Sequence, residues 1–143
     1  MITERTAYGF GAVVELEYAT AVERVKQALV DEGFGILCDI DVSATLHNKL
    51  GIEFRPYVIL GACNPPLAHR ALAEERDIGL LLPCNVIVYG DEAPGRSVIA
   101  ALDPVAVLGL TGRAELRPVA EDVSARLTRA LSAVERTVVE HTR

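Results

Sequence analysis

Apolar and polar residues alternate along two stretches of the first third of the chain. In Ala12–Tyr18 one face holds four apolar or aromatic residues: Ala12, Val14, Leu16 and Tyr18. The opposite face holds Glu15 and Glu17 beside Val13. In Phe34–Ile40 one face holds Phe34, Ile36, Cys38 and Ile40. Alternation with period two is typical of a strand with one buried and one wet face, so the pattern predicts two strands.

Apolar residues spaced three and four apart predict the long helices. Ala21–Glu32 is preceded by a capping-box pattern, in which Thr20 and Glu23 satisfy orphan backbone amides at a helix start. Its apolar stripe comprises Val22, Val25 and Leu29. Gly33 can adopt the left-handed backbone conformation that commonly ends a helix. The last helix is expected to begin near Pro118. Its stripe comprises Val119, Val123, Leu127, Leu131, Val134 and Val138.

A short helix is expected over Ala44–Leu50, because Asp41 or Ser43 can cap its start and Gly51 can end it. Leu46 and Leu50 would then face inward. His47 would face solvent or a neighbouring molecule, where it is either an ordinary exposed histidine or a general base.

Two continuous apolar runs, Tyr57–Cys63 and Asn85–Tyr89, indicate further strands. The first is apolar on both faces, which is typical of an interior strand. Asn64 and two prolines end it and begin a helix. The apolar stripe of that helix comprises Leu67, Ala68, Ala71 and Leu72. The second run is followed by a turn and by Ser97–Leu102, which we expect to return as its hairpin partner.

These elements follow the order β-α-β-(short α)-β-α-β-β-α. They predict an α+β domain with a single sheet of about five strands, two long helices packed on it, and short helices besides. The hairpin in the second half rules out a purely alternating Rossmann arrangement. The strand order beyond the hairpin stays open.

Composition adds an expectation about assembly and location. The 143 residues are expected to form one domain, residues 1–143. Half of the residues are apolar, yet no run is long enough to span a bilayer, so we expect apolar surface to be hidden in a homodimer. The first ten residues lack the apolar segment of a secretory signal. We therefore expect a cytoplasmic protein with free thiols and no membrane partner.

Charge and motif content exclude two classes of function. The formal net charge of −6 argues against recognition of a nucleic-acid backbone, which requires clustered Lys and Arg. No Gly-rich turn of the dinucleotide-binding or P-loop type follows a strand, and no cofactor is predicted.

Reactive side chains gather where the two apolar runs meet the loops. Cys63-Asn64 leaves the first run and Cys84-Asn85 enters the second. If the two strands are neighbours, the thiols can share a soft metal or form a reversible disulfide, with His69 as a further ligand. The spacing lacks the specificity of a C-x2-C site, and a buried free Cys commonly packs as a small hydrophobe. Metal binding is therefore only a weak candidate for this pair.

Other polar residues each have a structural and a functional interpretation. Asn64 and Asn85 either bond to the backbone at a strand end or hold a polar ligand group. Asp39 and Asp41 share one face of a strand, where they either share a cation or raise each other's pKa. A role as the cap of Ala44–Leu50 explains Asp41 equally well. Three further residues are candidates for a pocket mouth: Arg55, Tyr57 and Tyr89.

The motifs GACNP (Gly61–Pro65) and LPCNV (Leu82–Val86) resemble those of the DUF302 family, small bacterial and archaeal proteins of unassigned function. The resemblance covers Glu32–Leu72 and Ile78–Tyr89 and extends more weakly over almost the entire chain. It implies a β-α-β4-α sheet of the TATA-binding-protein-like class, commonly seen as a dimer. Cys63 and Cys84 fall on motif positions. Cys38 stands where relatives tend to carry another residue, which weakens any role for it.

The favoured hypothesis is a homodimeric, cytoplasmic module that binds a small ligand near the GACNPP and LPCN motifs. Its predicted ligand-contacting residues are Cys63, Asn64, Cys84, Asn85 and His69. The alternatives are a thiol-dependent redox protein or enzyme that uses Cys63 or Cys84, a soft-metal-binding protein, and a purely structural interaction domain. Whether the chain is an enzyme stays open.

Overall fold

The computed structural model describes the backbone of residues 1–142 and the side chains of residues 1–136. Six strands form one sheet in the order β1-β2-β6-β5-β4-β3, and every neighbouring pair is antiparallel. The strands are β1 (Thr3–Thr6), β2 (Gly9–Val14), β3 (Gly35–Asp41), β4 (Tyr57–Cys63), β5 (Cys84–Gly90) and β6 (Ser97–Leu102). The α-helices are α1 (Tyr18–Asp31), α2 (Val42–Leu50), α3 (Pro65–Glu74), α4 (Pro104–Leu108) and α5 (Arg117–Thr142). Three short 3-10 segments are η1 (Arg76–Leu81), η2 (Gly109–Thr111) and η3 (Ala114–Leu116).

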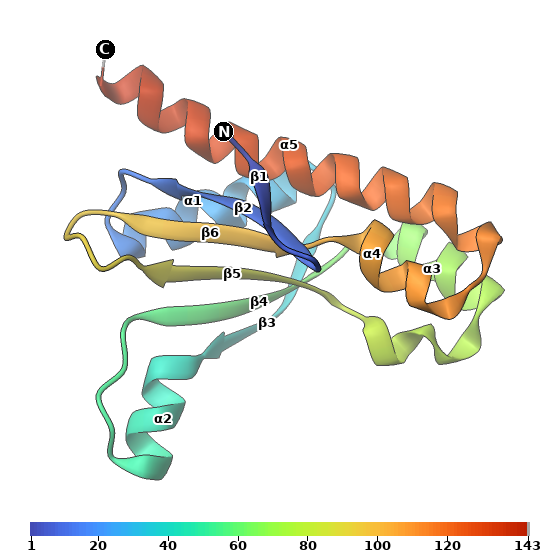
Figure 1. The fold of residues 1–143 in the computed structure, drawn as a ribbon, viewed down its shortest axis with the longest axis horizontal. Coiled ribbons are helices and arrows are strands. Elements are labelled where there is room, and N and C mark those ends of the chain that lie inside the picture. Colours follow the sequence, from blue (N-terminus) through green and yellow to red (C-terminus); the bar gives the residue numbers. More distant parts are fainter. Residues whose placement is uncertain (143) are drawn as a thin grey trace.

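The long helices α1 and α5 pack together on one face of the sheet and cover it (Figure 1). The core lies between these layers. Its fully buried aliphatic side chains include Val25, Leu29, Leu60, Val86, Ile99, Leu127 and Leu131. The helix α2 stands at one end of β4 and α3 at the other (Figure 1). None of the helices, over the residues that the structure describes, has the length and apolarity needed to cross a membrane.

The sequence predicted this architecture in outline. The domain is α+β with a single open sheet and two long helices on it, but the sheet has six strands where about five were expected. The two apolar runs are adjacent interior strands, because β4 pairs with β5. The predicted hairpin is formed by β5 and β6. The last helix begins at Arg117, next to the expected Pro118, and the side chain of Val138 lies outside the described residues.

The strand β1 was not predicted. Its sequence, TERT, is polar, and all four residues are exposed, so it carries no alternation that would mark a strand. It forms by pairing with β2 at the edge of the sheet.

The predicted strand Ala12–Tyr18 was placed too far along the chain. The strand β2 ends at Val14, which pairs with Ser97, the first residue of β6. Residues after Val14 therefore have no residue of β6 to pair with. The helix α1 consequently starts at Tyr18 instead of Ala21, and its N-cap is Glu17, not Thr20. The left-handed backbone conformation expected at Gly33, after the end of this helix, is confirmed by its φ of 90°.

A bulge divides the predicted face of Phe34–Ile40. Ile36 pairs with Ala62 and Cys38 pairs with Gly61, so Leu37 is an extra residue between them. A bulge of one residue exchanges the two faces of the strand beyond it. Ile36 therefore packs against the core, whereas Cys38 and Ile40 lie on the face that the long helices leave open.

The short helix α2 has no buried residue. Asp41 caps it, because its Oδ1 accepts a hydrogen bond from the Ala44 amide at 2.9 Å, and Gly51 ends it with φ 66°. Leu50 was expected to face inward but is 66% exposed. The prediction from apolar spacing was wrong here because α2 extends beyond the body of the protein and has no layer to pack against (Figure 1).

Gly11 allows β2 to lie very close to its neighbouring strand β6 in the sheet. A Cβ at this position would collide with the carbonyl oxygen of Ile99 and lie 2.7 Å from the Cα of Ala100, and both are backbone atoms. We expect Gly11→Ala to lower the free energy of unfolding by about 1–3 kcal/mol, as overpacking does in other proteins.

The matched control is Gly109→Ala. Gly109 has φ −62°, and no atom lies within 4 Å of its would-be Cβ. This change is expected to be neutral or to stabilise by about 0.4–1 kcal/mol through the unfolded state. Urea unfolding of both variants measures the difference, and equal stabilities would contradict the close approach of β2 to β6.

Candidate functional site

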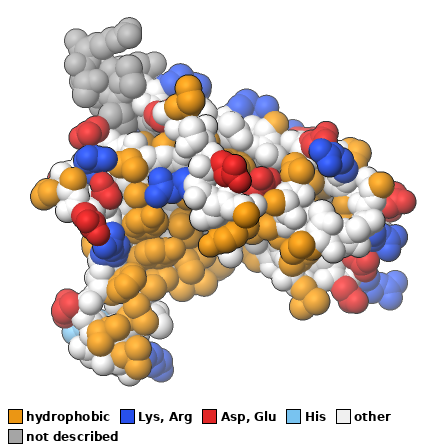
Figure 2. All heavy atoms as spheres, in the orientation of Figure 1, with side chains coloured by type: hydrophobic (Ala, Val, Ile, Leu, Met, Phe, Trp, Pro, Cys, Tyr) orange, Lys and Arg blue, Asp and Glu red, His pale blue; other side chains and the backbone are white. Residues whose placement is uncertain are grey.

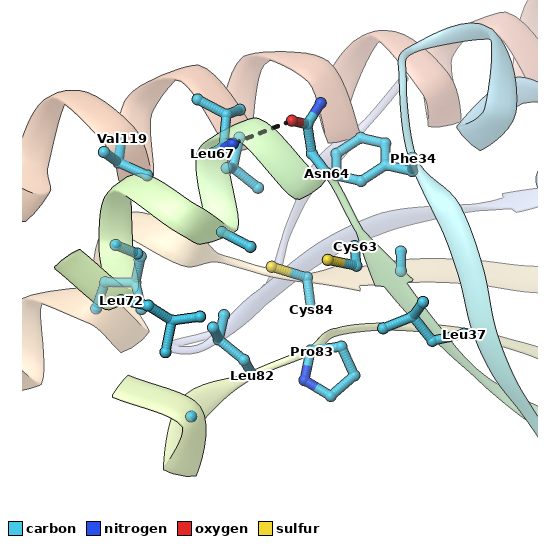
Figure 3. A pocket seen from close by; sticks show the side chains of 16 residues that line it. Phe34, Leu37, Cys63, Asn64, Leu67, Leu72, Leu82, Pro83, Cys84 and Val119 are labelled. Atoms are coloured by element: carbon cyan, nitrogen blue, oxygen red, sulfur yellow. Dashed lines mark hydrogen bonds between the residues drawn. The ribbon is translucent and has the colours of Figure 1, made fainter. Parts of the chain in front are cut away.

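A cavity of about 320 Å³ lies at the end of the sheet where β4 ends and β5 begins, beneath α3 (Figure 3). Side chains of α3 and of the segment leading into β5 form two of its walls, and residues of α4 and α5 complete the lining. The lining is almost entirely aliphatic or aromatic and contains no ionised side chain; it includes Phe34, Leu67, Leu72, Leu82, Leu108 and Val119.

The register of β4 and β5 brings both cysteine motifs to this cavity. Ala62 pairs directly with Cys84, so Cys63 is the next residue along the neighbouring strand. Figure 3 shows both thiol side chains reaching into the same cavity. The two cysteines therefore meet as predicted, because the two apolar runs are adjacent strands.

Burial sets the chemistry of Cys84. Removal from water raises the pKa of its thiol to about 11, and the neighbouring Cys63 contributes to the rise. Only the thiolate is an effective nucleophile, so Cys84 is poorly suited to nucleophilic chemistry at neutral pH. All three cysteines are free thiols.

Asn64 shapes the cavity by starting α3. Its side chain is buried, and its Oδ1 accepts a hydrogen bond from the Leu67 amide at 3.3 Å, which makes it the N-cap of the helix. The amide nitrogen lies 3.1 Å from where a Cβ of Gly33 would be, so the glycine leaves room for Asn64. The capping interpretation of this residue is what the geometry shows.

Two of the predicted ligand-contacting residues lie elsewhere. Asn85 pairs with Gly61 and faces the opposite side of the sheet from Cys84, because side chains alternate along a strand. His69 lies exposed on α3 and does not line the cavity. The structure therefore brings together Cys63, Asn64 and Cys84 but not the other two.

The remaining polar candidates have local partners. Lys26 pairs with Asp39 at 2.7 Å, and the hydrogen bond that the lysine donates to this carboxylate raises the pKa of the lysine. Hydrogen bonds from the Ala44 amide and the Ser43 hydroxyl lower the pKa of Asp41, the cap of α2. His47 lies near Glu53 at 3.4 Å on the exposed helix. Among the described side chains, no three His, Cys, Asp or Glu residues gather as ligands for a metal ion.

A second hollow, of about 400 Å³, lies on the open face of the sheet. Tyr57, Tyr89 and Asn85 line it from the interior strands, and Arg5 and Tyr8 line it from β1 and the turn after it. Sequence reasoning missed Arg5 and Tyr8 because β1 has no apolar pattern. Arg55, expected at a pocket mouth, lies outside this hollow and pairs with Glu92 at 3.7 Å.

Thiol alkylation in a variant that keeps only Cys84 (Cys38→Ser with Cys63→Ser) tests the burial argument. A rise of about two pKa units leaves roughly one-hundredth of the ordinary thiolate fraction at pH 8. We expect iodoacetamide to modify native Cys84 at least about 100-fold more slowly than free cysteine at pH 8. The rate should still be rising at pH 10, although a midpoint near 11 shifts somewhat when Cys63 is removed. An inflection at or below pH 9 in the native protein would contradict the assignment.

The comparisons with known proteins identify the family. The model of DUF302, a domain of unknown function, matches residues 11–134. Among solved structures, the crystal structure of an uncharacterised conserved DUF302 protein from Bacillus stearothermophilus has a TM-score of 0.81 and 32% sequence identity. That match covers 89% of this chain and 98% of the other. No curated protein matches the chain. The chain therefore belongs to the DUF302 family.

Proposed function

We propose that this protein is a small-ligand-binding module, active as a homodimer in the cytoplasm, and that the cavity beneath α3 is its binding site. The observation that carries the proposal is a cavity of about 320 Å³ walled by apolar side chains at the junction of the two cysteine motifs. Ligand sites are typically concave, largely apolar and about 300–1,000 Å³ in volume, with few polar groups.

The lining indicates a neutral, apolar ligand. The cavity contains no ionised side chain to pair with a charged group, and burying an unpaired charge is strongly unfavourable. The side-chain oxygen of Asn64 already accepts the capping hydrogen bond from the Leu67 amide. The thiols of Cys63 and Cys84 are soft, polarisable contacts that suit an apolar or sulfur-containing molecule.

The alternative is a thiol-based function, and the convergence of both cysteines on one cavity is the observation that favours it (Figure 3). A redox or nucleophilic role would have to begin at Cys63, because burial holds Cys84 in the protonated form. Soft-metal binding would rest on two thiols alone among the described side chains. Reversible binding of an apolar molecule requires neither a thiolate nor a third ligand, so we favour it.

The test uses N-phenyl-1-naphthylamine, a neutral probe whose fluorescence rises in apolar surroundings. We expect saturable binding to the wild-type protein. Ala68→Phe places a ring in the cavity, since Ala68 lines it, and is expected to weaken binding at least tenfold.

The control is Ala73→Phe, which adds the same ring to an exposed position of the same helix outside the lining. Its affinity should equal that of the wild type, and both variants should keep the native circular dichroism spectrum. Equal affinities for Ala68→Phe and wild type, or no saturable binding to the wild type, would remove the cavity from the proposal.

The homodimer proposal is supported by α2 and the segment after it. This helix has nine residues and none is buried, whereas isolated helices shorter than about 12–15 residues are marginal in water. Leu50, Ile52 and Phe54 expose large apolar side chains there. Figure 2 shows hydrophobic side chains gathered on α2. A second copy that packs on this segment would bury the exposed apolar surface and stabilise the helix.

Light scattering during gel filtration tests the dimer. The wild type is expected at twice the 15.4 kDa of one chain. The double variant Leu50→Asp with Phe54→Asp should be a monomer, because a dimer would bury the new carboxylates in the contact. Leu80→Asp is the control, because Leu80 is 88% exposed but lies in η1, beyond the other end of β4. A monomeric wild type, or dissociation by the control alone, would contradict this arrangement.

A further inference from the structure

The hollow on the open face of the sheet differs in chemistry from the cavity beneath α3. Residues paired across neighbouring strands share a face, and the core residues Leu60 and Val86 form one such pair on the helix side. Tyr57 with Tyr89, Ile59 with Ile87, and Gly61 with Asn85 form the alternate pairs. These residues therefore lie on the face away from α1 and α5, and four of the six line the hollow.

Aromatic side chains form one wall of the hollow. The rings of Tyr57 and Tyr89 stack with centroids 5.1 Å apart and planes 5° apart. Phe54 lies beyond this pair, with its ring centroid 6.2 Å from that of Tyr57. Burial, with the neighbouring Tyr89 and Tyr8, raises the pKa of Tyr57, so its hydroxyl stays a hydrogen-bond donor at neutral pH. Stacked aromatic pairs are pre-organised surfaces for another flat, apolar group.

The hairpin of β1 and β2 brings a cation to this wall. Arg5 lies in β1, and its Nη2 donates a hydrogen bond to the Tyr89 hydroxyl at 3.5 Å. Among the described residues Arg5 forms no ion pair with a carboxylate, so its remaining donors are available.

The polar groups of the hollow are matched to an anion. The chain has 20 acidic residues and a net charge of −6, yet no acidic residue lines this hollow. Its polar lining instead consists of side chains that can donate hydrogen bonds: Arg5, Thr6, Tyr8, Tyr57, Asn85 and Tyr89. Asn85 has no hydrogen-bond partner for its amide among the described residues, and its partner across the ladder is Gly61.

The floor of the hollow is apolar. Ile87, Ala100 and Leu102 form it from β5 and β6. A volume of about 400 Å³ is ample for a single-ring molecule with a charged substituent. An apolar floor, an aromatic wall and one unpaired guanidinium together favour a ligand with a flat apolar body and a negative charge, because Arg binds carboxylates in bidentate geometry.

We propose that the open face of the sheet is a second binding site, which takes a small aromatic carboxylate. Its carboxylate binds Arg5, and its ring lies on Ile87 and Ala100 beside the tyrosine pair. This site goes beyond the function proposed above, because it lies on the other face of the sheet. It favours negatively charged ligands, whereas the cavity beneath α3 disfavours any charged ligand.

Benzoate is the probe, and ¹H–¹⁵N NMR titration of the full chain locates and measures its binding. We expect shifts concentrated in β1 and at Asn85–Tyr89. Benzamide, which has the same ring without the charge, and acetate, which has the charge without the ring, should each bind at least tenfold more weakly. Binding of benzoate should also weaken as sodium chloride is raised.

Two variants assign the role of Arg5. Arg5→Gln removes the guanidinium and is expected to weaken benzoate at least tenfold, as loss of a charge-assisted hydrogen bond does. Arg70→Gln removes an equal charge from the exposed side of α3 and should leave the affinity unchanged. Tyr89→Phe removes the acceptor that holds Arg5 and should weaken binding severalfold, while its NMR spectrum stays native.

Several results would overturn the proposal. They are benzoate shifts confined to other elements, equal affinities for benzoate and benzamide, and equal losses in Arg5→Gln and Arg70→Gln. An absence of shifts because a second copy covers the face would also overturn it. Ala68→Phe, which blocks the cavity, should leave benzoate binding intact, so failure at one site is distinguishable from failure at the other.

Discussion

The pairing of β4 with β5 is the constraint on which the rest of the structure depends. These two interior strands place Ala62 opposite Cys84, and so bring together two motifs whose cysteines are separated by 20 residues in the sequence. The intervening residues form α3 and η1, which roof the end of the sheet. One register therefore makes both the cavity and its thiol lining. A slip of one residue would turn Cys84 to the open face and Asn85 to the core.

The two faces of the same strand pair have opposite chemistry because side chains alternate. On the helix side, Ala62 and Cys84 join an apolar core, and burial keeps the Cys84 thiol protonated. On the open side, Tyr89 and Asn85 stand beside Arg5. The two asparagines of the repeated Cys-Asn pair, Asn64 and Asn85, therefore have different surroundings. At the first junction the chain turns into α3 and Asn64 becomes a cap, whereas Asn85 remains within a strand.

The sequence was sufficient for elements that carry their own pattern. The interior strands, the β5–β6 hairpin and the convergence of Cys63 with Cys84 follow from continuous apolar runs and turn residues. It was insufficient where tertiary context decides. The polar strand β1 exists only through β2, and the bulge at Leu37 depends on how β3 pairs with β4. Arg5 and Tyr8 could not be assigned to a site without that hairpin, and α2 has an apolar spacing but no layer to pack on.

The proposed ligand site depends on the apolar cavity at the β4–β5 junction. The most direct measurement is the diffraction of a crystal pressurised with xenon, because apolar cavities of sufficient size stay dry and accept this gas. We expect a xenon peak among Cys84, Leu67 and Leu82, with no displaced water. A cavity filled by ordered water, or collapsed with α3 against the end of the sheet and free of xenon, would contradict it.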